Sequence, residues 1–151
     1  MSILWRAIGA FLALPGIVGF LLPITIALAA HCPARHLPVS IAIIGLGTLL
    51  LLSCARELYV TGRGTLAVWS PPQRLVTSGP YRLSRNPMYI AVLTILFGWW
   101  LLWGSRTLIL YALGCAAAFY LHVVLAEEPW VARTFGEEWR GYRDRVPRWL
   151  I

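Results

Sequence analysis

Two charged clusters, far apart in the sequence, carry the residue types that bind a ligand with both a positive and a negative group. The first is residues 79–89, a turn with two arginines that leads into an apolar segment, and the second is the acid pair Glu127 and Glu128. Arginine binds carboxylates through a planar fork of N–H donors, whereas glutamate binds ammonium groups and hydroxyls. Ionisable residues at the ends of membrane-spanning segments indicate a functional site by default. Together the two clusters predict a site for a ligand that carries both signs.

A structural reading of residues 79–89 is also open. Asn is a preferred N-cap residue and Pro fits the first helical position, so Asn86 and Pro87 can simply begin a helix. Arginines near a membrane surface extend their side chains toward the headgroups, and tyrosines are common at that depth. From the residues alone, a binding site and a structural helix start are equal alternatives.

The acid pair follows an apolar segment and precedes Pro129, so we expect it to close a membrane-spanning helix. Adjacent helical residues lie about 100° apart, so one glutamate can face the bundle interior while the other faces outward. Anions at a helix C-terminus oppose the helix dipole and therefore need cations nearby. Arg82, Arg85 or Arg133 can supply them structurally, and a cationic ligand can supply them functionally.

The composition predicts an integral membrane protein. Of 151 residues, 59% are hydrophobic and only 13% are charged, whereas a soluble domain has about 25% charged residues. The net charge of +7 comes from 13 arginines and no lysine. Because no basic helix or RNA-binding motif accompanies this charge, we expect contacts with anionic lipid headgroups and none with nucleic acid.

The apolar runs predict an all-α helical bundle with about four transmembrane helices, at residues 8–30, 38–56, 88–103 and 106–126. The connection at 104–106 is short enough to allow only an antiparallel hairpin. Pro15 and Pro23 predict a kink or a break in the first span. That span is longer than the apolar core of a signal peptide, so we expect it to be retained. The length leaves room for one domain, residues 1–151, with no second domain.

The arginine distribution predicts the orientation of the bundle. Five arginines lie between Arg56 and Arg85 and five lie beyond Glu128, whereas the other two connections hold only Arg35 and Arg106. Arginine-rich segments face the cytoplasm, so both charged clusters and the C-terminus are expected on the cytoplasmic side. The tail also repeats apolar side chains at helical spacing, which predicts an amphipathic helix at the membrane interface or over the mouth of the bundle. These side chains are Trp130, Phe135, Trp139, Tyr142 and Val146.

No metal site is expected. His31, Cys32 and His36 cluster in one short connection, but no fourth ligand is visible. His122 precedes the acid pair by five residues, and a lone histidine there is typical of a helix-packing hydrogen bond.

The order of several short motifs resembles the isoprenylcysteine carboxyl methyltransferase and phospholipid methyltransferase superfamily. The resemblance covers about residues 57–149, which we interpret as the catalytic half, with residues 1–56 contributing the first two spans. Each motif alone is weak, but the order of all of them on a small membrane protein is specific. They are Gly-Pro-Tyr-Arg at 79–82, Arg-Asn-Pro-Met-Tyr at 85–89, Glu-Glu-Pro at 127–129, Phe-Gly-Glu-Glu-Trp at 135–139 and Arg-Val-Pro at 145–147.

The resemblance implies a membrane enzyme that transfers a methyl group from S-adenosylmethionine to a lipophilic acceptor. It implies catalytic roles for Arg85, Glu127 and Glu128. The positions that match the family's donor-binding residues are Tyr81, Arg82, Arg85, Asn86, Pro87, Tyr89, Glu127 and Glu128.

The class of methyl acceptor is left open by two positions. The tail resembles the carboxyl methyltransferases most closely, which favours O-methylation of an isoprenylcysteine-like carboxylate. Those enzymes usually have His at the position of Asn86, whereas the phospholipid N-methyltransferases accept Asn there, and the Gly expected two residues after Tyr89 is Ala91. Phospholipid N-methylation is therefore the alternative. A small transporter or scaffold is more distant, because a transporter needs an acid near the middle of a span and no span has one. The sequence gives no oligomeric state.

Overall fold

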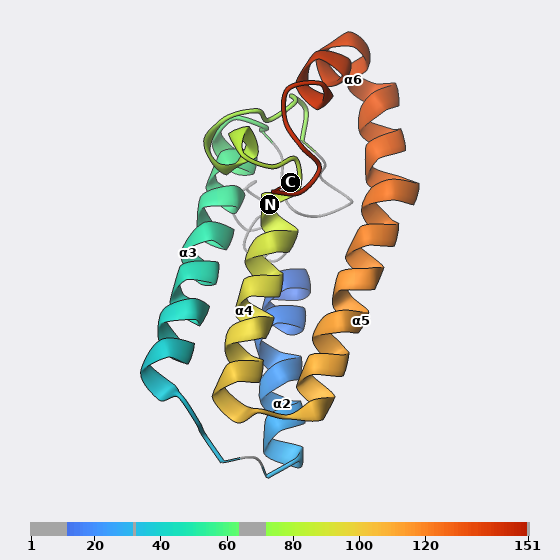
Figure 1. The fold of residues 1–151 in the computed structure, drawn as a ribbon. Helices are drawn as coiled ribbons and strands as arrows, with labels where there is room; N and C mark the ends of the chain where they lie inside the picture. Colours follow the sequence, from blue (N-terminus) through green and yellow to red (C-terminus); the bar gives the residue numbers. More distant parts are fainter. Residues whose placement is uncertain (1–11, 32, 64–71, 151) are drawn as a thin grey trace.

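The computed structural model describes residues 12–31, 33–63 and 72–150, and the regular structure in these residues is helical, with no strand among them. Helices α2, α3, α4 and α5 run alongside one another (Figure 1). The all-α fold is thus confirmed for the described part of the chain. Its elements are η1 (Leu12–Leu21), α2 (Leu22–Ala29), α3 (Leu37–Val60), η2 (Gly79–Arg82), α4 (Pro87–Trp103), α5 (Arg106–His122), η3 (Val123–Glu127) and α6 (Glu128–Arg143).

The ends of the bundle differ in what they carry. The connections from α2 to α3 and from α4 to α5 lie at one end, whereas η2, α6 and the C-terminal residues gather at the other (Figure 1). Two helical runs, Leu37–Val60 and Arg106–Arg143, are long and apolar enough to cross a membrane, and two shorter apolar helices lie beside them. Four membrane crossings and their sidedness stay predictions.

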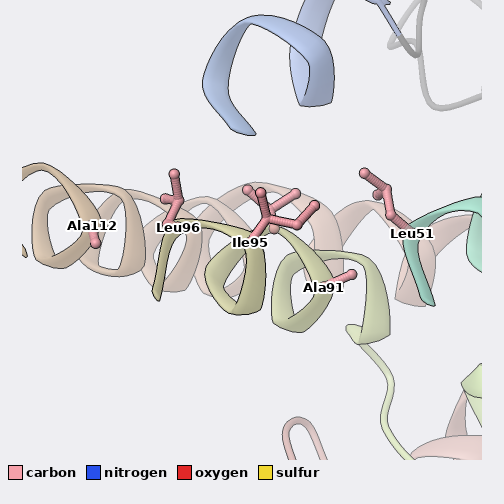
Figure 2. Close-up of a cluster of buried hydrophobic side chains, with 6 residues drawn as sticks. Leu51, Ala91, Ile95, Leu96 and Ala112 are labelled. Carbon is pink, nitrogen blue, oxygen red and sulfur yellow. The ribbon is translucent and has the colours of Figure 1, made fainter. Parts of the chain in front are cut away.

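Close packing of α3 on α4 forms the core. Ala91, Ile95 and Leu96 of α4 lie between Leu51 of α3 and Ala112 of α5 (Figure 2). Glycines allow the close approach: a Cβ added to Gly47 would lie 2.8 Å from Ile95 Cγ1, and one added to Gly98 would lie 2.6 Å from Ile44 Cγ1. Small residues at helix contacts are what membrane bundles use to bring backbones together.

The first helix is continuous through its prolines. The π-helical segment η1 passes directly into α2, and Leu21 at the junction has helical dihedral angles (φ −61°, ψ −52°). Pro23 has no N–H, so the carbonyls four and five residues before it, on Gly19 and Val18, lose their usual partner. Trp99 Nε1 donates to the Gly19 carbonyl (2.8 Å) and Tyr111 Oη to the Val18 carbonyl (2.9 Å). Neighbouring helices thus satisfy the backbone groups that proline frees. Residues 8–11 of the expected span lie outside the described residues.

The acid pair does not close a helix, and this corrects the sequence-based expectation. The chain stays helical through both glutamates and Pro129, with the π-helical turn η3 ending at Glu127 and α6 following directly. The argument from an unfavourable helix C-terminus therefore does not apply to Glu127 and Glu128. The direction changes later, at Gly136 (φ 50°, ψ −114°), where a positive φ suits glycine. Beyond it the tail turns back over the end of the bundle (Figure 1).

Candidate functional site

The two charged clusters meet at the end of the bundle where η2 and α6 lie. Tyr89 Oη donates to Glu127 Oε1 at 2.5 Å, and Arg85 Nη1 donates to Glu128 Oε1 at 2.8 Å. His122 Nε2 lies 3.6 Å from the same Glu127 oxygen. The expectation that both clusters share one end of the bundle is confirmed. Each glutamate contacts a different residue of the 79–89 cluster, Glu127 contacting Tyr89 and Glu128 contacting Arg85.

Glu128 lies between two arginines. Arg85 donates one N–H to it, whereas Arg148 forms a fork, with Nε 2.9 Å from Oε1 and Nη2 2.7 Å from Oε2. Bidentate arginine–carboxylate pairs are among the stronger polar interactions in proteins. Sequence reasoning missed Arg148, because nothing in the sequence separates it from the other arginines of the tail. Arg133, considered as a partner, instead donates from Nε to the Pro129 carbonyl of its own helix.

Asn86 lies at the predicted start of a helix, but its side chain does not cap that helix. Helix α4 begins at Pro87 with Asn86 as its N-cap residue, but the Asn86 side chain makes no capping hydrogen bond. Its Nδ2 instead donates to the Arg148 carbonyl at 3.0 Å, and Ser84 Oγ donates to the same oxygen at 3.0 Å. Asn86 therefore attaches the C-terminal tail to the start of α4.

The amphipathic helix α6 covers part of the site with its aromatic face. Trp139 and Tyr142 are buried, and the Arg85 guanidinium lies 5.3 Å from the centre of a Trp139 ring. Tyr142 Oη donates to the Tyr81 carbonyl at 2.7 Å, which fixes the tail to η2. Burial raises the pKa of the Tyr81 hydroxyl well above its ordinary value, so it stays protonated. Trp130, on the same helix, remains exposed.

The arginines keep their charge in this setting. Burial lowers the pKa of Arg85, while the carboxylate of Glu128 opposes that shift. Hydrogen bonding to Glu128 raises the pKa of Arg148. Arginine pKa values start so high that both groups are cationic at neutral pH. Arg85 Nε is buried and has no hydrogen-bond partner among the residues that the structure describes.

A cavity of about 420 Å³ opens between η2, the start of α4 and the η3–α6 junction. Most of its wall is apolar, with contributions from Leu58, Val76, Met88, Val131 and Phe135. Arg74 and His122 also line it, and sequence reasoning gave neither a binding role. Of the eight predicted binding residues, the wall includes Tyr81, Arg85, Asn86, Tyr89 and Glu127.

The other three predicted binding residues lie outside the wall. Arg82 is exposed, and Pro87 is buried at the start of α4. Glu128 forms an ion pair with Arg85 but does not line the cavity. Glu128 thus contacts the binding residues and not the cavity.

A second carboxylate fixes the segment that carries the arginines. Glu57, near the end of α3, accepts hydrogen bonds from Ser78 Oγ (2.5 Å) and Thr61 Oγ1 (3.1 Å). Gly79 has φ +57°, and a Cβ at that position would lie 2.9 Å from Glu57 Cγ. Only glycine adopts this conformation at such close approach without strain. This contact places η2 against α3.

In the described ranges, no three His, Cys, Asp or Glu side chains are close enough together to hold a metal ion. Cys32 lies outside those ranges.

The sequence model of one family, phospholipid methyltransferase, matches residues 36–138. That range is well over half of the chain and includes both charged clusters. No curated protein and no solved structure is similar enough to the chain to count as a match. The predicted resemblance to the isoprenylcysteine and phospholipid methyltransferase superfamily is confirmed. With its apolar helices and its charged end, the chain belongs to the phospholipid methyltransferase family of membrane methyltransferases.

Proposed function

We propose that the cavity binds S-adenosylmethionine and that the protein transfers its methyl group to a lipophilic acceptor. The observation that carries this proposal is the wall of the cavity, which combines a half-buried arginine, a carboxylate and tyrosines with a mainly apolar surface. A volume of about 420 Å³ falls within the roughly 300–1,000 Å³ typical of small-molecule sites.

The polar groups fit the chemistry of this donor. S-adenosylmethionine supplies a methyl group on a positively charged sulfur, together with an ammonium group and a carboxylate. Arg85 lines the cavity and gives only one Nη1 N–H to Glu128, so its other Nη N–H groups suit the carboxylate. Glu127 suits the ammonium group or the ribose hydroxyls. Tyr81 and Tyr89 suit the sulfonium through cation–π attraction.

The protein's contribution is chiefly placement. Methyl transfer is an in-line displacement, so aligning the reactants supplies most of the acceleration. The tail supports this role, because its buried Trp139 and Tyr142 side chains form part of the cavity wall. Apolar residues from α3, α4 and α6 suit an acceptor that enters from the bilayer, while the donor enters from the cytoplasm.

We infer a carboxylate acceptor of the isoprenylcysteine type, on the resemblance of the tail at 135–147. A carboxylate needs no base, because it is deprotonated at neutral pH. An amine acceptor needs one, and Glu127, on the wall of the cavity beside Tyr89 and His122, is the group for it. Asn86, the feature shared with N-methylating enzymes, is what makes an amine the second candidate.

Two measurements test the proposal. Calorimetry on the purified protein in detergent should detect S-adenosylmethionine binding, and an absence of binding contradicts the proposal. Membranes incubated with methyl-labelled donor should yield base-labile label if an ester forms, and base-stable lipid label if an amine is methylated.

The pH profile separates the two acceptors again. A carboxylate acceptor predicts a rate that is flat above about pH 6, because carboxyl pKa values lie near 4. An amine acceptor predicts a rate that rises with pH until the amine is deprotonated. Glu127→Gln should weaken donor binding in either case, and should also lower the methyl-transfer rate below the pKa of the amine if the acceptor is an amine.

A further inference from the structure

We propose that Arg148 is a positioning residue of the site: by holding both oxygens of Glu128, it keeps the Arg85 guanidinium free to bind the carboxylate of the methyl donor. This inference rests on the proposed function, and it assigns a role to a tail residue that does not line the cavity.

The division of Glu128 between two arginines carries the argument. Arg148 contacts both carboxylate oxygens, through Nε (2.9 Å) and Nη2 (2.7 Å), whereas Arg85 contacts only Oε1, through Nη1 (2.8 Å). One positive charge of the trio is left uncompensated, next to a cavity that Arg85 lines. A preorganised cation of this kind favours an anionic ligand group.

The geometry of Arg85 follows from this division. Its guanidinium is fixed by one bond to Glu128 and by the face of Trp139, 5.3 Å from a ring centre, and its Nε is buried without a partner among the described residues. Without Arg148, both oxygens of Glu128 become available, and Arg85 can form the usual two-pronged pair with them. That pair takes up donors that the ligand needs and neutralises the local charge.

Residues 84–86 also hold the backbone of the tail at Pro147 and Arg148. The Arg148 carbonyl accepts from Ser84 Oγ and Asn86 Nδ2, and the Arg85 backbone N–H donates to the Pro147 carbonyl at 2.9 Å. The segment that presents Arg85 thus also fixes the backbone of Arg148. Arg145 provides a contrast, because its Nε donates to the Gly141 carbonyl in the last turn of α6, four residues before it.

The experiment measures, by calorimetry in detergent, the affinity of each variant for S-adenosylmethionine and for its decarboxylated analogue. The variants are Arg148→Ala, Arg148→Lys, Arg85→Ala, the Arg85→Ala/Arg148→Ala double variant and the control Arg145→Ala. Arg148→Ala should weaken S-adenosylmethionine binding about tenfold or more, but change binding of the decarboxylated analogue less than about twofold. Arg148→Lys should recover part of the affinity, because it restores the charge without the fork.

The double variant separates positioning from folding. If Arg148 acts through Arg85, removing it from the Arg85→Ala protein should cost little further affinity, so the two effects are not additive. Additive losses, or equal weakening of both ligands by Arg148→Ala, overturn the inference while leaving the proposed function intact. Failure of the unaltered protein to bind S-adenosylmethionine instead overturns the proposed function, and the inference with it.

Discussion

The body of the bundle and its charged end are held together by different physics. In the body, α3 and α4 touch through glycines and buried aliphatic side chains such as Leu51 and Ile95. At the charged end, Glu57 and Glu128 bind side chains from distant parts of the chain. The body therefore sets the spacing of the helices, and the charged end sets the geometry of the site. Changes in one region should leave the other largely intact.

The largest effect confined to the charged end is expected from Glu128→Gln. Without the carboxylate, Arg85 and Arg148 lose their shared partner and repel each other, so both move from their positions. Affinity for S-adenosylmethionine should fall at least about 30-fold, or about 2 kcal/mol, while circular dichroism shows unchanged helix content. The control is Glu137→Gln, which removes an exposed ion pair with Arg140 on the same helix and should have little effect. Unaltered affinity in Glu128→Gln contradicts the proposed site.

An effect on the body of the bundle, and not on the charged end, is expected from Gly47→Ala. The added Cβ would lie 2.8 Å from Ile95 Cγ1 and 3.0 Å from the Ala91 carbonyl oxygen, so α3 and α4 must move apart. Such overpacking costs about 1–3 kcal/mol, visible as a lower thermal unfolding temperature in detergent. Gly45→Ala is the matched control, because nothing lies within 4 Å of its added Cβ. Equal stability of the two variants would show that this contact does not limit the body.

A smaller effect is expected from Tyr142→Phe, which tests how the tail is fixed. The change removes the hydrogen bond to the Tyr81 carbonyl and leaves that buried oxygen without its donor. The expected cost is about 1 kcal/mol, confined to the tail. Trypsin should cleave faster after Arg143 and Arg145, with no change in the unfolding temperature of the bundle. A lowered unfolding temperature would mean that the tail and the body unfold together.

The smallest effect is expected from Ser78→Ala, which removes one of the two side-chain hydrogen bonds that Ser78 and Thr61 donate to Glu57. The bonds from Thr61 and Arg56 still hold the carboxylate, so the cost should be about 0.5–1 kcal/mol. Hydrogen exchange at residues 72–78 should rise slightly, and donor affinity should change less than about twofold. Thr77→Ala, at the exposed neighbouring position, serves as the control. A large loss of affinity would place the Glu57 contact within the site itself.

Much of the fold follows from local sequence. The apolar runs predicted the helices, and the Gly-Ser connection at 104–105 predicted the hairpin, because burial periodicity and chain breakers act over short distances. Asn86-Pro87 predicted the start of α4 for the same reason. The predicted end of the helix at Glu127 was wrong. A proline normally marks a boundary, but the helix continues through Pro129, directly after the π-helical turn η3.

Part of the candidate site follows from sequence as well. The two charged clusters were each visible as charges beside apolar segments, and arginine counts placed them at the same end of the bundle. Their pairing needed the structure: Tyr89 with Glu127 and Arg85 with Glu128 are contacts between segments about 40 residues apart. Sequence patterns carry no information on which partner a long side chain selects once several are within reach.

The sequence by itself determined that this protein is helical and apolar, that its charges gather at one end of the bundle, and that its motifs are those of a membrane methyltransferase. These properties follow from composition and from residues near one another in the chain. Only the tertiary structure decided that Arg148 shares Glu128 with Arg85, and that Asn86 attaches the tail where an N-cap was expected. Those contacts join residues about 20 and 60 positions apart, and only the packed helices bring such residues within hydrogen-bonding distance.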